Sequence, residues 1–393
     1  MDLHSTLPFS SLAFFQFAGL AVLFFLLVKL TLKDRLPYSW VLAAFNASYI
    51  VFLFTKPLQL AVLILYLYVA FLALRKWYKS NNVVLPMLLL ALPIFGMKTV
   101  ILFPSEDASD LMLNAQNIFQ IAGLSYMVFK VIGLYIDERR NTEKISLLAF
   151  FNFTAFVPTL LIGPIDRFRR FEADVAKAYE QISLSFYAKA WDRLILGVLY
   201  KYIIAEAIFR FGLSQLHDDG SLLYHVSYMY TYLFYLFFDF AGYSLLAIAF
   251  GNFIGLDVPI NFDRPFLSVN PKEFWKKWHK SLGDWLGDYF FKPLFKEFTS
   301  KKILNPIQRQ NLALFLTFTL MGFWNGFELH YILSGMLFGL YSVVHNYYIY
   351  RCKKTKKDVF FGNLSSTGVR WLSIAIMIQL VAFSIYLFSG NLF

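Results

Sequence analysis

The chain has 393 residues, of which 58% are hydrophobic and 16% are charged. An average soluble protein has about 45–50% apolar and about 25% charged residues, so this composition excludes an ordinary soluble globular protein. The formal net charge of +11 lies mostly in short loops between apolar runs, which predicts contact with anionic membrane lipids and no binding of nucleic acid.

Long apolar runs follow one another along the chain. Most are near the roughly 20 residues that an α-helix needs to cross a bilayer, and they lack the alternation of barrel strands. The sequence therefore predicts an all-α, multi-pass protein of the cell (plasma) membrane with about ten or eleven crossings. The expected membrane helices cover residues 12–32, 38–55, 57–74, 84–103, 115–136, 190–212, 225–252, 331–350 and 369–389, with a shorter run at 312–324.

Basic residues alternate with neutral or acidic turns in the loops of the N-terminal part. The turn at Lys56-Pro57 and the acidic loop 105–110 separate three basic loops. Positively charged loops stay in the cytoplasm, so the pattern predicts an N-terminus on the outside. The basic loops contain Lys29, Lys33 and Arg35; Arg75, Lys76 and Lys79; and Arg139, Arg140 and Lys144.

Three segments depart from simple spans. Residues 147–162 are apolar but lead into the basic sequence Gly163-Pro-Ile-Asp-Arg-Phe-Arg-Arg170, which a full span would place outside. We therefore expect a re-entrant or broken helix, surrounded by protein or by a water-filled cavity. Residues 255–310 should form a basic cytoplasmic insertion with amphipathic helices at the membrane interface. A helix break is expected at Asn325-Gly326.

We expect one membrane-embedded domain over residues 1–393. Its N-terminal spans occupy residues 1–145, and a core that bears the sequence motifs occupies residues 146–350. Residues 351–393 provide a basic loop at 351–357 and the last span.

Asp239 lies inside an otherwise apolar run, Phe237-Phe-Asp-Phe-Ala-Gly-Tyr-Ser244. A charged group at membrane depth is costly, which makes it a functional candidate by default. Two interpretations stay open. Asp239 either binds substrate, or it is buried in a pair with an arginine or tyrosine and fixes helix packing.

The stretch from Asn261 to His279 is polar, basic and aromatic within a mostly apolar chain. Its lysines, Lys276 and Lys277 among them, would attract phosphate or carboxylate. Spacing alone favours an interfacial helix, whose snorkelling lysines and aromatic belt account for the aromatic residues from Phe274 to Trp278. That interpretation does not account for His279, the one side chain here that titrates near neutral pH.

Histidines also follow the break at Trp324-Asn325-Gly326. Helical spacing places His330 about a turn and a half beyond Asn325, and His345 lies further along the same expected helix. A lone histidine on such a helix is more often a packing or interfacial residue than a catalyst. The chain has a single cysteine, no paired histidines at metal-binding spacing and no nucleotide-binding motif. We therefore expect neither a metal nor a bound cofactor.

Four blocks, in order, resemble the membrane-bound O-acyltransferase superfamily over most of the chain from about Gly123 onward. The second is similar to the branch that transfers D-alanine to teichoic acid, and the last two follow the general superfamily pattern. The blocks are Gly123-Leu-Ser-Tyr-Met-Val-Phe-Lys130, Pro158-Thr-Leu-Leu-Ile-Gly-Pro-Ile-Asp-Arg-Phe-Arg-Arg-Phe171, Phe238-Asp-Phe-Ala-Gly-Tyr-Ser244, and Asn261-Phe-Asp-Arg-Pro-Phe266 with Phe274-Trp-Lys-Lys-Trp-His-Lys-Ser-Leu282.

The resemblance implies a fold with a central funnel and the transfer of an acyl group across the membrane. A phosphopantetheine thioester on an acyl carrier protein would deliver the group from the cytoplasm. A hydroxyl of a cell-envelope polymer, or an extracytoplasmic acceptor protein, would receive it outside. The basic insertion suits electrostatic steering of an acidic carrier.

The chain departs from the family pattern at its expected catalytic residue. The family motif at 324–326 is Trp-His-Gly, but this chain has Asn325, and it has Phe338 where the family often has a further histidine. Asparagine cannot take a proton near neutral pH. The resemblance then leaves His279 or a repositioned His330 as base, with Asn325 polarising the thioester carbonyl. The expected substrate-binding residues are Asp239, Arg167, Trp278, Trp324, Lys276 and Lys277.

Three functions stay open at this level. The first is an acyltransferase that moves D-alanine or a similar small acyl group to an envelope polymer. The second is a catalytically impaired relative that acts as an envelope scaffold or as a conduit for acyl groups or lipids, because Asn325 replaces the histidine. The third is a transporter, because broken helices also suit transporters, although no inverted repeat is visible.

Overall fold

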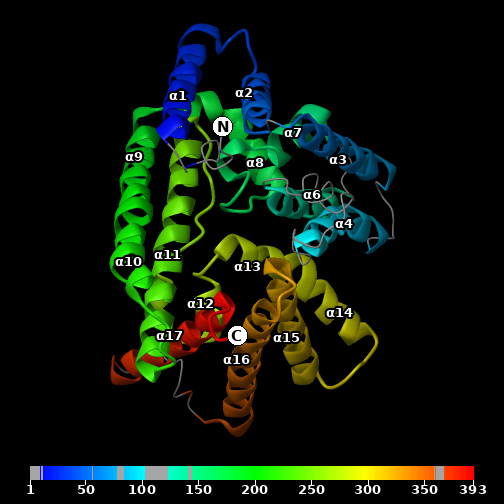
Figure 1. Cartoon of the computed structure of the whole chain (residues 1–393). Helices are drawn as coiled ribbons and strands as arrows, with labels where there is room; N and C mark the ends of the chain where they lie inside the picture. Colours follow the sequence, from blue (N-terminus) through cyan, green and yellow to red (C-terminus); the bar gives the residue numbers. More distant parts are fainter. Residues whose placement is uncertain are drawn as a thin grey trace. The chain divides into compact units, whose positions relative to one another are not determined.

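The computed structural model describes residues 9, 12–54, 56–77, 84–101, 123–139, 144–357, 359 and 367–393. Every secondary-structure element among these residues is a helix (Figure 1), as the apolar runs predict. The chain divides into two compact units. Unit 1 is Met1–Gly197 with Tyr243–Pro259, and unit 2 is Val198–Gly242 with Ile260–Phe393.

Unit 1 contains most of the predicted N-terminal spans as helices. Its helices are α1 (Leu12–Leu32), α2 (Tyr38–Leu53), α3 (Pro57–Lys76), α4 (Val84–Ile101), α6 (Leu124–Glu138), α7 (Leu147–Thr154), α8 (Phe168–Gln181), α9 (Leu184–Val198) and the C-terminal part of α11 (Leu222–Phe253). Pro57 begins α3, where its fixed φ suits the first helical turn. The acidic loop 105–110, Lys79, Arg140 and the first residues of the run 115–136 lie outside the described residues.

The predicted break in residues 147–162 is confirmed. Helix α7 ends at Thr154, a 3₁₀ turn η3 (Val157–Thr159) follows, and the chain stays irregular up to α8. A buried broken helix must find partners for its backbone groups. The buried side chain of Asn46 supplies one, because its Oδ1 accepts a 3.2 Å hydrogen bond from the Val157 N–H. Whether this segment re-enters the membrane stays a prediction.

Four of the described helices are long and apolar enough to cross a membrane, namely Ala13–Leu32 in α1, α3, α11 and α17 (Thr367–Ser389). Two shorter apolar helices lie at Tyr38–Leu53 and Leu85–Gly96. These helices support a multi-pass membrane protein. The total of ten or eleven crossings stays a prediction.

Unit 2 contains the fourth motif block and residues 238–242 of the third. Helix α9 continues into a π-helical turn η4 (Leu199–Ala205) and then α10 (Glu206–Phe211), and η5 (Leu213–Gln215) leads to α11. Short elements follow before two long helices. They are η6 (Pro265–Leu267), α12 (Pro271–Trp275), α13 (Lys280–Leu286), η7 (Gly287–Phe291), α14 (Lys292–Ser300), α15 (Pro306–Asn325), α16 (Leu329–Thr355) and α17.

The predicted helix break at Asn325 is confirmed, because α15 ends there and α16 begins at Leu329. The run at 312–324 is longer than expected. Pro306 occupies the first turn of α15, and Asn305 and Gln308 form a capping box that extends the helix toward its N-terminus. The predicted basic loop 351–357 is wrong in part, because α16 remains helical to Thr355.

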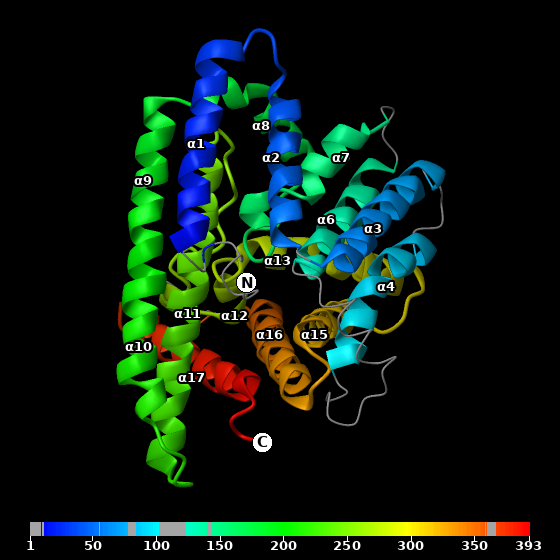
Figure 2. The same cartoon turned by 45° about the horizontal axis from the view of Figure 1, so that its top comes forward.

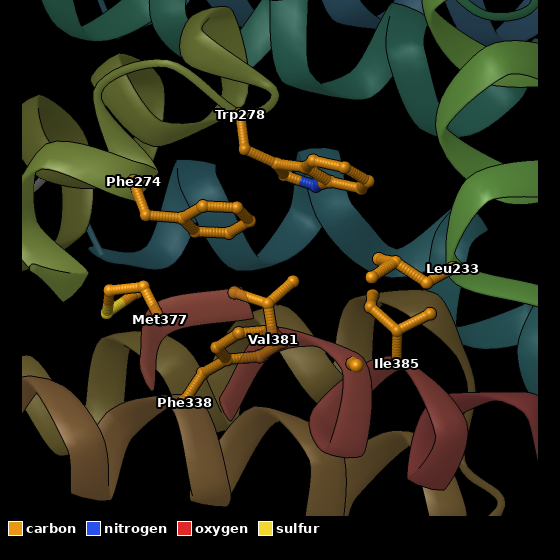
Figure 3. Close-up of a cluster of buried hydrophobic side chains, with 8 residues drawn as sticks. Leu233, Phe274, Trp278, Phe338, Met377, Val381 and Ile385 are labelled. Carbon is orange, nitrogen blue, oxygen red and sulfur yellow. The ribbon is translucent and has the colours of Figure 1, made fainter. Parts of the chain in front are cut away.

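A hydrophobic cluster in unit 2 overturns the interfacial interpretation of the basic, aromatic stretch. Phe274 and Trp278 are 2% and 5% exposed. Figure 3 shows their rings facing Phe338 of α16 and Val381 of α17. Aromatic side chains buried this way contribute to a core rather than to a belt at the lipid headgroups. Lys276 is exposed and Lys277 pairs with Glu273, so neither lysine belongs to this cluster. Lysines at the surface beside buried aromatic residues give the same sequence pattern as an interfacial helix.

Helices α15 and α16 approach closely through two glycines. A Cβ added at Gly335 would lie 2.5 Å from the Phe318 carbonyl oxygen and 3.0 Å from the Gly322 Cα. That distance is too short for any side chain, so one helix would have to move. The glycine pair therefore fixes the separation between α15, which ends at the Asn325 break, and α16, which follows it.

Gly335→Val should consequently destabilise the protein. Overpacking of this kind costs typically about 1–3 kcal/mol, so we expect a lower unfolding temperature of the full chain in detergent micelles. Gly19→Val is the matched control, because a Cβ at Gly19 meets no atom within 4 Å. An unfolding temperature of Gly335→Val equal to that of the wild type would show that the helix pair tolerates a wider separation.

Candidate active site

His279 occupies an unusual backbone position between α12 and α13. It precedes the first residue of α13 with φ 45° and ψ 48°, in the left-handed region. A non-glycine residue there is uncommon and marks a position that the surrounding structure determines. Two backbone hydrogen bonds supply that constraint, from Lys280 N–H to Asn261 O (2.9 Å) and from Asp263 N–H to Lys277 O (2.9 Å). They hold residues 261–263 against residues 277–280.

The Asn261 side chain sets the tautomer of His279. Asn261 Oδ1 lies 3.3 Å from the backbone N of Ser281 and 2.9 Å from its Oγ. A backbone N–H can only donate, so the amide atom that faces it is the oxygen. The same oxygen lies 3.1 Å from His279 Nδ1, and therefore Nδ1 carries the proton. In the neutral ring Nε2 then keeps its lone pair.

His279 Nε2 is the reactive end of this arrangement. It is buried and has no hydrogen-bond partner within the described residues. The imidazole packs edge-on against Phe240 at 4.7 Å and lies 6.4 Å from Trp324 between ring centroids. An unpartnered buried acceptor is costly, so the position suits a group that meets a hydroxyl only when substrate is present.

Burial also sets the charge of His279, which lies outside the membrane-spanning segments. Its side chain is 5% exposed, and desolvation lowers its pKa from 6.5 to about 3. The imidazole is consequently neutral near pH 7. A neutral imidazole with a fixed tautomer can act as a general base, which Asn325 cannot.

The low pKa of His279 predicts a pH effect on stability. The unfolded chain binds a proton at His279 below about pH 6.5, whereas the folded chain does so only near pH 3. Stability contributed here is therefore present above the unfolded pKa and lost as the pH falls from 6.5 toward 3. We expect the drop in unfolding temperature between about pH 7 and about pH 5 to be smaller in His279→Gln than in the wild type. Equal drops in both proteins would refute a depressed pKa.

Asn325 stands at the last position of α15, beside Trp324. Its Nδ2 donates a 2.9 Å hydrogen bond to the Met321 carbonyl oxygen one turn earlier, which anchors the amide to the helix end. The contact between Trp324 and His279 brings this end of α15 to the His279 ring. The structure thus gathers three of the predicted site residues, His279, Trp324 and Asn325, in one region of unit 2.

His330 is not part of that group in the contacts of the described residues. It lies in the first turn of α16, with its ring centroid 4.0 Å from that of Tyr331. It also faces Gly390 just after α17, because a Cβ added at that glycine would meet the imidazole at 3.3 Å. The predicted spacing from Asn325 assumed one continuous helix, whereas the chain breaks between them. A role for His330 as base stays a prediction.

Asp239 forms an ion pair that the sequence did not identify. Its Oδ1 lies 2.5 Å from Lys201 Nζ, and the side chains of Asp239 and Lys201 are 37% and 19% exposed. The predicted pairing of a buried Asp239 with an arginine or tyrosine is therefore corrected, because its ionic partner is Lys201 and its carboxylate is partly exposed. Lys201 lies in a π-helical turn, a feature often found at functional sites.

The ion pair predicts a recovery experiment. Removing one member leaves the other charge without its counter-ion at membrane depth, so Lys201→Met and Asp239→Asn should each lower the unfolding temperature of the full chain. The double variant should recover most of that loss, because replacing both side chains leaves no charge without a counter-ion. The unfolding temperature of all four proteins in detergent micelles measures this coupling. Additive losses would mean that the two side chains act independently.

The remaining predicted binding residues of unit 2 lie around α12. Lys277 Nζ pairs with Glu273 at 2.7 Å, and Lys276 is exposed. Trp278 belongs to the buried cluster already described. The binding roles of these three residues stay predictions.

Arg167 belongs to unit 1, where it immediately precedes α8. Its backbone N–H donates to Asp166 Oδ1 at 2.6 Å, and Asp166 also accepts from Arg170 Nε at 2.6 Å. The Gly163–Arg170 sequence is therefore held by its own acidic residue. A direct role for Arg167 in binding substrate stays a prediction.

Sequence reasoning missed Asn261 and Lys201 as functional residues. Asn261 is the first residue of the fourth motif block, and this position could have identified it as a candidate site residue. Lys201 is a lone lysine within a mostly apolar run that includes Leu194 to Ala205. A charged residue within a membrane segment is energetically costly, and this property could have identified Lys201 as a functional candidate. In both cases the partner lies many residues away, and sequence spacing does not reveal it.

Comparison with known proteins identifies a protein family and several similar proteins. Residues 41–388 match the model of the MBOAT, membrane-bound O-acyltransferase family. The chain is 36% identical to the teichoic acid D-alanyltransferase of Bacillus subtilis over 284 residues, and 35% identical to that of Streptococcus thermophilus over 294 residues, covering 70% of each chain in both cases. It is 31% identical to the probable alginate O-acetylase of Pseudomonas fluorescens over 231 residues, or 56% of this chain and 44% of that protein.

Proposed function

Because this chain belongs to the membrane-bound O-acyltransferase family, as its motif blocks predict, we propose that it transfers a D-alanyl group to a hydroxyl of a teichoic acid. The donor in this proposal is a phosphopantetheine thioester on an acyl carrier protein. The reaction takes place in the cell membrane, with the donor on the cytoplasmic side and the acceptor outside.

The observation that carries the proposal is the buried His279 with its fixed tautomer. Its Nδ1–H is held by Asn261, and its neutral Nε2 has no partner within the described residues. A neutral nitrogen with an open lone pair can accept the proton of a substrate hydroxyl, which the amide of Asn325 cannot do. Relatives that are 35–36% identical are named for D-alanyl transfer, which favours this acyl group over acetyl.

The proposed chemistry starts at His279 Nε2. This nitrogen takes the proton of the acceptor hydroxyl while the hydroxyl oxygen forms a bond to the thioester carbonyl carbon. The carbon–sulfur bond then breaks, and its electron pair leaves with the sulfur. The proton passes from Nε2 to that sulfur, which yields the ester, the free thiol and a neutral His279. The amide of Asn325 orients the acyl group beside Trp324.

A second candidate function follows from Asn325 itself. If transfer requires a histidine at that position, this chain is a catalytically impaired family member that serves as a scaffold in the envelope or as a conduit for an acyl or lipid intermediate. The observation in its favour is the departure from the family motif.

The first test is transfer by the purified full-length protein in lipid vesicles. Carrier protein loaded with labelled D-alanine is supplied on one side and teichoic acid on the other. We expect label in the acceptor as an ester that mild alkali releases. Carrier loaded with labelled acetate tests acyl specificity. No transfer from either donor by a folded protein would favour the second candidate function.

A further inference from the structure

A pocket of about 170 Å³ lies in unit 1 at the C-terminal ends of α3 and α6, beside the residues that precede α7. Figure 2 shows α3, α6 and α7 close together, as their helix contacts also indicate. Phe71 and Leu74 give the pocket an apolar part. Arg75, Arg139 and Lys144 line it with positive charge.

The carboxylate in the lining is already compensated. Glu138 is 3% exposed, and Arg169 holds it with a pair of hydrogen bonds, one of them from Nε to Oε1 at 2.8 Å. The pocket therefore presents net positive charge to a ligand. Arg75 and Lys144 are exposed, and the Arg75 guanidinium lies over the Phe71 ring at 6.0 Å from its centroid.

The sequence of α3 places this pocket at the level of lipid headgroups. Helix α3 is one of the candidate membrane spans, and Arg75 and Lys76 form its last turn. Trp77 follows directly, with Lys76 Nζ 5.8 Å from its ring centroid. Tryptophan and basic residues at the end of a span mark the membrane–water interface. Phe71 and Leu74 lie up to one turn deeper, where acyl chains begin.

We propose that this pocket binds an anionic phospholipid. Its phosphate lies among Arg75, Arg139 and Lys144, and the upper part of an acyl chain lies along Phe71 and Leu74. Arginine matches the oxygens of a phosphate with paired N–H groups, and basic pockets between membrane helices bind lipid headgroups. Arg169 already engages the carboxylate of Glu138, so this carboxylate offers little attraction to the ammonium of a zwitterionic lipid.

Native mass spectrometry of the detergent-solubilised full chain tests this proposal. The ligands are short-chain phosphatidylglycerol, short-chain phosphatidylcholine and inorganic phosphate. The test variant Arg75→Gln/Lys144→Gln removes two lining charges. The control variant Arg35→Gln/Lys33→Gln removes one arginine and one lysine, both exposed, from the turn after α1. Unfolding temperatures confirm that both variants are folded.

We expect phosphatidylglycerol to bind the wild type and the control variant equally, and the test variant about 25-fold more weakly, since each of the two basic residues contributes about fivefold. Phosphatidylcholine should bind more weakly than phosphatidylglycerol. Equal binding of phosphatidylglycerol by both variants would overturn the proposal. Binding of inorganic phosphate as tight as that of the lipid, lost in the test variant, would assign the site to a free phosphate ion instead of a lipid.

Discussion

His279→Gln should lower acyl transfer by about two to four orders of magnitude, the usual cost of removing a general base. Glutamine keeps a polar group of similar size but cannot take a proton near neutral pH. The variant should fold, because Asn261 Oδ1 retains its two hydrogen bonds from Ser281. The initial rate of labelled D-alanyl transfer in vesicles, at saturating carrier and acceptor, measures the effect.

The matched control for this experiment is His217→Gln. His217 is an exposed histidine in the turn before α11, so the same chemical change there should leave the rate unaltered. If His279→Gln transfers within about threefold of the wild type while its unfolding temperature is unchanged, His279 is not the base. His330 would then be the next candidate, tested by the same substitution.

The helices could be predicted from the sequence because the property that defines them is local. The run at 12–32 coincides with α1, and the runs at 38–55 and 369–389 differ from α2 and α17 by two residues or fewer at either end. A uniformly apolar stretch of bilayer length has few alternatives to a helix. The exceptions involve caps and ends, as at Asn305, whose capping box extends α15 beyond its apolar part.

The candidate site was predictable only in part, because its geometry depends on distant pairs. His279 and Asn325 were identified from motifs and charge, but the hydrogen bond that fixes the His279 tautomer comes from Asn261, eighteen residues away in the chain. Lys201 and Asp239 are separated by 38 residues. Trp278 was ambiguous for another reason: an aromatic residue among lysines has the same pattern in a belt and in a core. Only its contacts with α16 and α17 distinguish the two.

Asn325→His separates the two candidate functions. If His279 is the base, the wild type transfers acyl groups, and we expect Asn325→His to change its rate by less than about tenfold. The double variant His279→Gln/Asn325→His should remain as slow as His279→Gln alone, because the new imidazole lies at the helix end without the Asn261 hydrogen bond that fixes the tautomer of His279. The four proteins are compared in the same vesicle assay, with Asn325→Gln as the control for side-chain size.

Transfer by Asn325→His alone, with none by the wild type, would mean that the fold supports acyl transfer but that the natural chain is catalytically inactive. The search would then move from substrates to the envelope proteins or lipids that the chain binds.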